Sequence, residues 1–370
     1  MKYYIIAGEA SGDLHGANLM RALRRLDPEA TFRFWGGDAM QGEGGQPVRH
    51  IRDLAIMGFV EVALHLRTVL GNISLCKRDI EAWKPDVIVG VDYPGFNLKI
   101  EKWAHGRGFR TAHYISPQLW AWKKGRIKGM RQYLDLLCYI LPFEQDFYAS
   151  HNMPQACYVG HPLMDAIANF QTDNSGLPEE DGRPLIALLP GSRKQELKKC
   201  LPDMVRLAQR HPDYRFVVAG MSLLGTAIYN KMIPARSNIS VVYDQTYPLL
   251  ASAYAAVVCS GTATLETGLF HVPQVVCYRA NAISIAIAKA IIGKRINHIA
   301  LVDLIDDSNV VTELLQGDFN DRRLDAEFHL ITADSANRQR ILDGYHRVEQ
   351  KLGGPGASLR TSQKIIDLAK

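Results

Sequence analysis

The feature that most constrains the fold is a repeated alternation of short apolar runs with segments of helical pattern. The runs are about five residues long and rich in Val, Ile, Leu and aromatic residues. Continuous apolar runs between helices are typical of a parallel sheet that helices cover on both faces. We predict strands at residues 3–7, 31–35, 87–91 and 111–115 in the first half of the chain, and at 185–189, 215–219, 239–243, 255–259 and 274–278 in the second.

The alternation is interrupted once, by a polar stretch at 170–183 that contains Gly, Pro, Asn and Ser. This composition indicates a linker, and 370 residues exceed the usual size of a single core. We therefore predict an α/β protein with two doubly wound, Rossmann-like domains that face each other across a cleft. Their predicted bounds are 1–168 and 169–344, and a C-terminal helix at about 345–370 is expected to pack back on the first domain.

Composition places the protein among ordinary globular chains, with 47% hydrophobic and 22% charged residues. The start enters a strand-like run without a signal-peptide pattern, and no apolar stretch reaches the ~18 residues of a spanning helix. The six cysteines form no C-x-x-C pair, which is typical of reduced core thiols. No Asp-x-Asp element argues for a bound divalent ion. We expect a cytoplasmic protein that needs no metal and no cofactor.

Two loops of small residues in the second half indicate a site for phosphate. Leu-Pro-Gly-Ser-Arg at 189–193 and Ser-Gly-Thr-Ala-Thr-Leu-Glu at 260–266 each follow a predicted strand and open a helical segment. The free N–H groups and the dipole at a helix N-terminus favour an anion, so two such turns predict a diphosphate held between loops. The candidate binding residues are Gly191, Ser192, Arg193, Ser260, Gly261, Thr262 and Glu266.

Three side chains extend this site toward a nucleotide. The guanidinium of Arg193 can bind a phosphate through two parallel hydrogen bonds, although a surface Arg after a turn is the alternative. Arg279, after the strand at 274–278, is a weaker second cation, and Glu266 can accept bonds from ribose hydroxyls. A nucleotide-linked donor is therefore the first hypothesis.

Polar residues also follow the first strand. Glu9, Ser11, Asp13 and His15 offer acceptors, donors and a titratable base within one turn, at the strand end that lines the ligand site of open α/β sheets. The alternative is a helix entry that Ser11 or Asp13 merely caps. The glycine spacing does not match G-x-G-x-x-G, so a dinucleotide fingerprint is weak here.

Asp92 ends the strand at 87–91, beside a Pro-Gly turn. A carboxylate in this position is well placed to take a proton from an acceptor hydroxyl. The alternative is an Asp that only opens the turn. We interpret Asp92 as a general base.

Residues 102–134 contain eight Lys or Arg and no acidic residue. Tryptophans mixed with cations suit an anionic membrane surface. A solvated basic face and a nucleic-acid site are the alternatives, and we expect no nucleic acid. The predicted contact residues are Trp120, Trp122, Lys123, Lys124 and Arg126.

Residues 57–73 carry apolar side chains at helical spacing, among them Phe59, Leu66 and Val69. Such a stripe is usually core. Flanking cations allow a second interpretation, a groove for acyl chains at the membrane surface.

Taken together, these segments make the chain similar to the lipid-A-disaccharide synthases. The resemblance rests on eight stretches in family order: GEASGD (8–13), MGFVEV (57–62), VDYPGFN (91–97), HYISPQLWAW (113–122), LPFEQDFY (141–148), GHPL (160–163), LPGSR (189–193) and SGTATLE (260–266). The combination covers about 300 residues and is highly specific.

The resemblance implies an inverting GT-B glycosyltransferase of lipopolysaccharide synthesis. Its substrates would be UDP-2,3-diacylglucosamine and 2,3-diacylglucosamine 1-phosphate, and its products the β-1,6 disaccharide and UDP. Asp92 matches the family's candidate base, while Glu9, Ser11 and Asp13 match the acceptor side. Family members attach peripherally to the inner membrane, and some form homodimers by exchanging C-terminal segments.

The chain departs from the family at Val302-Asp303, where Pro-Asn is common, and at Ser308-Asn309, where a charged pair is common. An ionised Asp near a diphosphate would repel it. Two other functions stay open: a UDP-sugar epimerase or other GT-B enzyme that acts on soluble sugars, and a non-catalytic nucleotide-sugar-binding or membrane scaffold protein.

Overall fold

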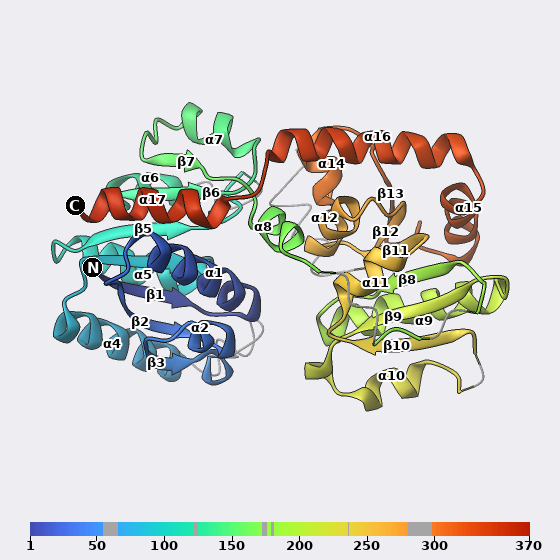
Figure 1. Ribbon diagram of the computed structural model, residues 1–370, viewed down its shortest axis with the longest axis horizontal. Helices are drawn as coiled ribbons and strands as arrows, with labels where there is room; N and C mark the ends of the chain where they lie inside the picture. The colour runs from blue at the N-terminus through green and yellow to red at the C-terminus, as the bar shows by residue number, and fades with distance from the viewer. Residues whose placement is uncertain (55–65, 121–124, 172–175, 179–180, 236, 280–297) are drawn as a thin grey trace. The chain divides into compact units, whose positions relative to one another are not determined.

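The computed structural model describes residues 1–54, 66–120, 125–171, 176–178, 181–235, 237–279 and 298–370. The chain forms two compact units (Figure 1). The first unit contains Met1–Ala166 and Gly354–Lys370, and the second contains Ile167–Gly353. Each unit is built around one parallel sheet.

The first unit holds a seven-stranded sheet of order β3-β2-β1-β4-β5-β6-β7. Its strands are β1 (Lys2–Ala7), β2 (Thr31–Gly36), β3 (Gln46–His50), β4 (Val87–Val91), β5 (Arg110–Tyr114), β6 (Leu136–Tyr139) and β7 (Ala156–Tyr158). The helices described with it are α1 (Ala10–Leu26), α2 (Asp38–Gly42), η1 (Ile51–Asp53), α4 (Leu66–Trp83), α5 (Pro94–His105), α6 (Arg126–Tyr133), α7 (Glu144–Ser150), α8 (Pro162–Ala168) and α17 (Ala357–Ala369).

Strand β1 shows why these apolar runs form a sheet buried on both faces. Tyr3 and Ile5 belong to the core cluster under α1 and α17, whereas Tyr4 and Ile6 belong to the cluster on the other face, with residues of α4 and α5. Successive side chains of a strand point to opposite faces. Both faces therefore need apolar residues, and the run is continuous rather than alternating.

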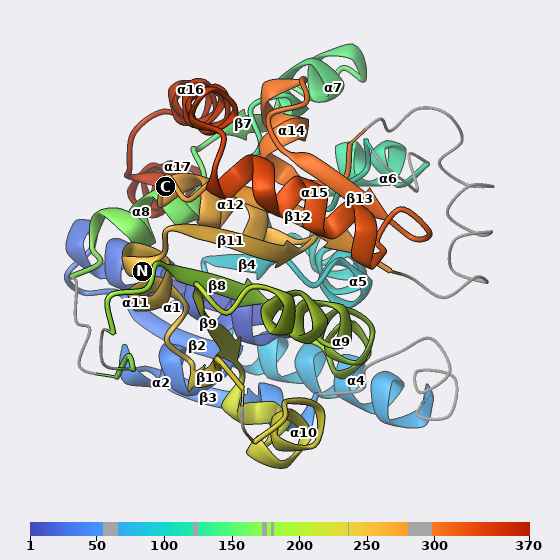
Figure 2. The ribbon, with the colours of Figure 1, turned by 90° about the vertical axis from the view of Figure 1, so that its right-hand side faces the viewer.

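The second unit holds a six-stranded sheet of order β10-β9-β8-β11-β12-β13 (Figure 2). Its strands are β8 (Leu185–Leu189), β9 (Arg215–Gly220), β10 (Ile239–Tyr243), β11 (Ala255–Cys259), β12 (Gln274–Tyr278) and β13 (Thr312–Leu315). Its helices are α9 (Lys194–Arg210), η2 (Ser222–Leu224), α10 (Thr226–Met232), α11 (Thr246–Ser252), α12 (Thr262–Leu269), α14 (Leu301–Asp306), α15 (Asp321–Thr332) and α16 (Ser335–Leu352). Helices α9 and α15 pack against each other and against the sheet.

All nine predicted strands are present, with bounds that differ by at most one residue, and the predicted fold class is confirmed. The prediction missed β3, β6, β7 and β13. These strands are three to five residues long and lie at or next to a sheet edge. The edge strands among them are partly exposed, so they lack the continuous apolar run that marks the central strands.

Strand order reverses once in each sheet, between β1 and β4 in the first unit and between β8 and β11 in the second. From each of these pairs, the earlier strands are added toward one edge of the sheet and the later strands toward the other edge. Ligands of open α/β sheets bind beyond the carboxyl ends of the strands at such a reversal. The segments that follow β1, β4, β8 and β11 are therefore the candidate binding segments, and all four carry motifs that sequence analysis identified.

Helix α17 returns the chain to the first unit, where it packs against α1 (Figure 1). Its N-terminus is capped by Asp165, whose carboxylate accepts hydrogen bonds from the backbone N–H groups of Gly356, Ala357 and Ser358. Among the helices of the described segments, none is both long and apolar enough to cross a bilayer.

Candidate active site

Asp92 lies at the carboxyl end of β4, in a turn with unusual backbone geometry. Asp92 and Tyr93 have φ angles of 48° and 50°, in the left-handed region. This conformation is uncommon for residues other than Gly and costs free energy, so it persists only where surrounding contacts hold it. Nδ2 of Asn97 provides such contacts, because it donates to the carbonyl oxygens of Asp92 at 2.7 Å and Ile6 at 3.1 Å. The turn therefore fixes Asp92 beside the end of β1.

The carboxyl group of Asp92 is partly buried. Burial raises its pKa, and the nearby His113 lowers the pKa in part. A carboxylate whose basicity is raised is suited to general base catalysis. The role of Asp92 as a general base stays a prediction.

Two buried ionisable residues, Glu101 and His113, lie next to Asp92, and sequence analysis did not assign them a role. Nδ1 of His113 is 2.7 Å from Oε1 of Glu101, and neither side chain is exposed. Burial alone would lower the pKa of His113, but the carboxylates of Glu101 and Asp92 outweigh it and raise that pKa. Among the described residues, neither Nε2 of His113 nor Oε2 of Glu101 has a hydrogen-bond partner. Buried charge is costly, and such clusters concentrate at functional sites.

A signal for this pair was present in the sequence. Glu101 is the one acidic residue of α5, and it follows the buried Ile100. His113 is an ionisable residue within the buried part of strand β5. Gly90 of β4 makes room for the pair, since a Cβ there would collide with Oε1 of Glu101.

The polar side chains after β1 differ in their surroundings: some are exposed, and others are buried. Glu9 and Ser11, at the start of α1, are exposed. The carboxylate of Asp13 is buried and accepts bonds from the backbone N–H groups of Gly37, Ala39 and Met40 at 2.6, 3.0 and 3.1 Å. Asp13 therefore holds the loop that begins α2, and this differs from the acceptor-side role that we expected.

His15 also differs from the expectation of a titratable base. Burial lowers its pKa to about 4, although Asp165 opposes the shift. A group with this pKa is neutral at physiological pH and a weak base. Glu9 and Ser11 remain the acceptor-side candidates in this segment.

The first phosphate-type loop joins β8 to α9. Gly191 has a φ of 103°, and a Cβ at this position would lie 2.6 Å from Cβ of Glu196. Oε2 of Glu196 accepts a hydrogen bond of 3.2 Å from the backbone N–H of Arg193. The Arg193 guanidinium is 69% exposed and lies 3.3 Å from Oε1 of Glu196. An exposed pair of this kind is weak, so Arg193 is available to a phosphate.

The second loop joins β11 to α12, and β8 and β11 are adjacent strands. The two loops therefore leave the same edge of the sheet side by side. Oγ of Ser260 donates to the carbonyl oxygen of Ile299 over 3.2 Å, whereas Gly261 and Thr262 are exposed. The first N–H groups of a helix have no partner within it, so α9 and α12 both offer donors here.

Glu266 lies one turn into α12. Burial raises the pKa of its carboxyl, and the hydroxyl of Tyr247, which donates to Oε1 over 3.2 Å, lowers it in part. The side chain is held in place by one partner and is not fully enclosed. A carboxylate so placed can accept bonds from a ribose diol.

Arg279 is engaged elsewhere than predicted. Its Nη1 is 2.9 Å from Oδ2 of Asp203 on α9, and its guanidinium lies over the ring of Phe319. The carboxylate of Asp203 is only 5% exposed. The cation therefore neutralises a buried acid inside the unit, and we remove Arg279 from the donor-site residues.

Asp303, the departure from the family pattern, is buried in α14. Its Oδ1 accepts bonds from the N–H groups of Val310 and Val311 at 2.9 and 3.0 Å. Burial raises its pKa to about 7. The same segment contacts the second loop through the N–H of Leu301, which donates to Oγ1 of Thr264 over 3.1 Å. The carboxyl group thus supports the backbone behind the loop.

The predicted membrane and acyl contacts are described only in part. Phe59, Trp122, Lys123 and Lys124 lie outside the described residues, and Leu66 begins α4. Val69 of α4 and Arg126 of α6 are partly exposed. The ring of Trp120 packs edge-on against Phe143, with centroids 5.0 Å apart. The role of these residues stays a prediction.

Two doubly wound parallel sheets, one ending in a half-buried carboxylate and the other in two loop–helix turns, define the GT-B fold. Solved structures share the fold over the full chain. The glycotransferase of kitacinnamycin matches with a TM-score of 0.71 at 14% identity, covering 100% of this chain and 99% of that one. The UDP-GlcNAc 2-epimerase from Neisseria meningitidis bound to UDP-GlcNAc matches with a TM-score of 0.71 at 11% identity, covering 99% and 100%.

Sequence comparison places the chain within this class. The chain belongs to the lipid-A-disaccharide synthetase family, whose model matches residues 3–363. The lipid-A-disaccharide synthase of Syntrophus aciditrophicus is 36% identical over 99% of this chain and 97% of its own length. That of Geobacter sulfurreducens is 33% identical over 98% and 96%.

Proposed function

We propose that this protein transfers 2,3-diacylglucosamine from UDP-2,3-diacylglucosamine to the 6-hydroxyl of 2,3-diacylglucosamine 1-phosphate. The products are the β-1,6-linked lipid A disaccharide and UDP. Family membership supports the reaction class. The observation that carries the chemistry is the partly buried, strained Asp92 at the strand reversal, beside a raised-pKa histidine.

Asp92 acts as the general base in this proposal. Its carboxylate takes the proton of the acceptor 6-hydroxyl while that oxygen attacks the anomeric carbon of the donor sugar. The new C–O bond forms on the face opposite the diphosphate, the bond from the anomeric carbon to the diphosphate oxygen breaks, and the configuration inverts. Burial raises the pKa of Asp92 and strengthens it as a base, and His113 opposes that shift in part.

The leaving UDP accumulates negative charge as the bond breaks. We assign its stabilisation to the N–H groups at the starts of α9 and α12 and to Arg193, rather than to a metal. Fixed donors aimed at developing charge contribute about 3–4 kcal/mol each in favourable sites. Glu266 accepts the ribose hydroxyls, which orients the nucleotide without adding charge near the phosphates.

Both substrates carry acyl chains, and we propose that the protein works as a cytoplasmic, peripheral protein at the inner-membrane surface. Each buried methylene contributes ~0.8 kcal/mol, so burial of a few methylenes outweighs several exposed ion pairs at about 0–1 kcal/mol each. The apolar stripe at 57–73 is the candidate acyl contact, and the basic, Trp-containing segment at 102–134 is the candidate surface contact.

The direct experiment incubates the purified protein with UDP-2,3-diacylglucosamine and 2,3-diacylglucosamine 1-phosphate. We expect stoichiometric release of UDP and a disaccharide of the summed mass. UDP release that is absent, or that does not require the acylated acceptor, would contradict the proposal.

A second function has one observation in its favour. The fold is shared with a UDP-GlcNAc 2-epimerase at a TM-score of 0.71. An epimerase would convert UDP-GlcNAc alone, with no acceptor and no net UDP release. Incubation with UDP-GlcNAc, followed by chromatography of the nucleotide sugars, separates the two functions.

A further inference from the structure

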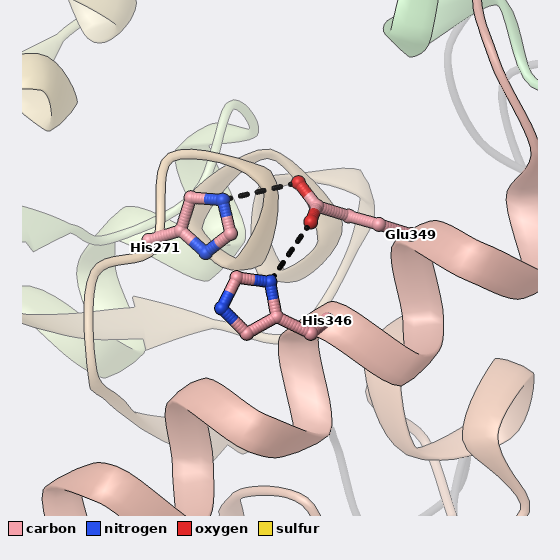
Figure 3. A group of neighbouring side chains, drawn as sticks. All are labelled: His271, His346 and Glu349. Carbon is pink, nitrogen blue, oxygen red and sulfur yellow. Dashed lines mark hydrogen bonds and ion pairs between the residues drawn. The ribbon is translucent and has the colours of Figure 1, made fainter.

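Three side chains of metal-binding type converge in the second unit, at the end of α12 opposite the phosphate-type loop (Figure 3). His271 lies two residues beyond α12, and His346 and Glu349 lie on α16. Nε2 of His271 is 3.1 Å from Oε1 of Glu349, and Nδ1 of His346 is 3.4 Å from Oε2. The potential ligand atoms of the three residues all lie within 4.8 Å of one another.

These separations match those of a tetrahedral zinc site. Zn²⁺ binds His nitrogen and carboxylate oxygen at about 2.0–2.1 Å, which places neighbouring ligands about 3.3 Å apart. Each imidazole nitrogen lies near this distance from a different oxygen of Glu349, at 3.1 and 3.4 Å, so a small adjustment of the side chains suffices for both nitrogens and the carboxylate to bind one ion. Two His and one Glu form a ligand set that zinc takes in proteins, with a fourth position left for water.

One carboxylate brings both imidazoles together. Each oxygen of Glu349 faces a different imidazole, and the two rings are 4.9 Å apart between centroids. A single divalent ion can be coordinated by the carboxylate and by both imidazoles at once.

The helix α16 presents its two ligands from a fixed position. His346 and Glu349 are three residues apart and therefore lie on one face of the helix. The neighbouring Tyr345 is buried. Its hydroxyl donates to the carbonyl oxygen of Val272 over 3.1 Å and accepts a hydrogen bond from Nε2 of Gln274 over 3.0 Å. These bonds attach α16 to the segment directly after His271.

The third ligand is held by its backbone. His271 has a φ of 54°, and its N–H donates to the carbonyl oxygen of Gly268 over 3.0 Å. Gly268 also allows the two helices to approach, because a Cβ there would lie 3.2 Å from the ring of Tyr345. Packing thus brings the ligands together without help from an ion.

We propose that His271, His346 and Glu349 form a binding site for one divalent transition-metal ion, with Zn²⁺ as the best match. The side chains are 40%, 61% and 28% exposed, so an ion and a completing water can reach them from solvent. A bound ion links the end of α12 to α16, the last helix of the second unit before the chain returns to the first. The site contains none of the residues that we assign to sugar transfer, and its test is independent of that proposal.

The test is calorimetric titration of the full-length, reduced protein with zinc chloride, at a pH where His is neutral. We expect one ion per chain. His346→Ala and Glu349→Gln each remove one ligand, and we expect each to weaken zinc binding by about 10-fold or more. His329→Ala is the matched control, because His329 is an exposed histidine of α15 in the same unit; its affinity should equal that of the unchanged protein.

Thermal unfolding provides a second measurement. Zinc should raise the unfolding temperature of the unchanged protein and of His329→Ala. It should not raise that of a double variant with His271→Ala and His346→Ala. Without metal, the double variant should unfold at the same temperature as the unchanged protein. Cobalt should give the visible absorption of a four- or five-coordinate ion only where both histidines are present. The proposal is overturned if zinc does not bind, or if the double variant binds it as tightly as the unchanged protein, since the ion would then lie on other groups such as the thiols.

Discussion

Nδ1 of His113 and Oε1 of Glu101 are 2.7 Å apart, with both side chains fully buried beside the end of β4. The pair joins β5 to α5 and contributes a positive charge to the environment of Asp92. Because a lone buried charge is costly, removal of either partner should be unfavourable. The Glu101–His113 pair therefore has two measurable consequences, one for the pH dependence of activity and one for stability.

Asp92→Asn should reduce the turnover number by about 10²–10⁴-fold, the usual contribution of a general base. The amide keeps the size of the side chain but accepts no proton. Affinity for UDP should stay nearly unchanged, because we place the nucleotide on the loops after β8 and β11. UDP release measures turnover, and titration with UDP measures binding. Asp213→Asn, at an exposed position, is the control; activity of Asp92→Asn near that of the control would remove Asp92 from its role.

Glu101→Gln should shift the acid limb of the pH–rate profile to higher pH. Without the Glu101 carboxylate, burial lowers the pKa of His113, and the histidine becomes neutral. The pKa of Asp92 then rises, because His113 was the charge that lowered it, and more alkaline conditions are needed to ionise the base. A fall in rate with an unchanged pH profile would assign the pair a purely structural role.

The same substitution tests the pair's contribution to stability. His113 has a raised pKa in the folded protein, so the free energy of unfolding that it contributes is fully present below its unfolded pKa and is lost as pH rises through its folded pKa. The difference in unfolding free energy between the unchanged protein and Glu101→Gln should therefore shrink as pH rises through the folded pKa of His113. Denaturant unfolding at a series of pH values measures it, and a difference that grows with pH would contradict the assignment.

Asp303→Asn should stabilise the protein at alkaline pH. Burial raises the pKa of Asp303 in the folded protein to about 7, against an ordinary value of 3.8. The free energy of unfolding therefore falls as pH rises from about 4 to 7, and the loss stays constant at higher pH. At about 1.4 kcal/mol per pKa unit, the upper bound is about 4 kcal/mol. The amide oxygen of Asn can still accept the bonds from Val310 and Val311. Equal stabilisation at pH 4 and pH 8 would show that the charge is not the cause.

Arg193→Ala should mainly affect UDP binding, whereas Arg279→Ala should mainly affect stability. Loss of the exposed Arg193 should weaken UDP binding and reduce turnover, with little change in unfolding free energy. Loss of Arg279 removes one of the two cations that pair with the buried Asp203 and leaves Arg206 in place, so it should cost about 1 kcal/mol of stability. Its UDP affinity should be close to normal. UDP titration and denaturant unfolding of both variants distinguish the two roles.

Much of the architecture was predictable from local sequence. The apolar runs identify the central strands, because a strand covered on both faces must be apolar at every position. The motifs after β1, β4, β8 and β11 were recognisable because small residues and polar residues follow directly on those runs. Short edge strands such as β3 and β13 were missed, since partial exposure removes the signal.

The state of each polar side chain was less predictable. Asp13 and Glu9 are close in sequence and were given the same role, yet three backbone N–H groups from residues 37–40 engage the carboxylate of Asp13 and leave Glu9 exposed. Arg193 and Arg279 both follow strand ends, but of these two only Arg279 forms an ion pair with Asp203. The partners that decide these cases come from other parts of the chain.

By itself, the sequence determined which segments form strands, which turns precede helices and which family the chain resembles, since each of these depends on neighbouring residues. The tertiary structure decided which strand ends meet at the sheet reversals, which carboxylates stay free, and that Glu101 and His113 share a buried site. The physical reason is that burial and hydrogen bonding set the charge of a side chain, and both are supplied by residues that folding alone brings together.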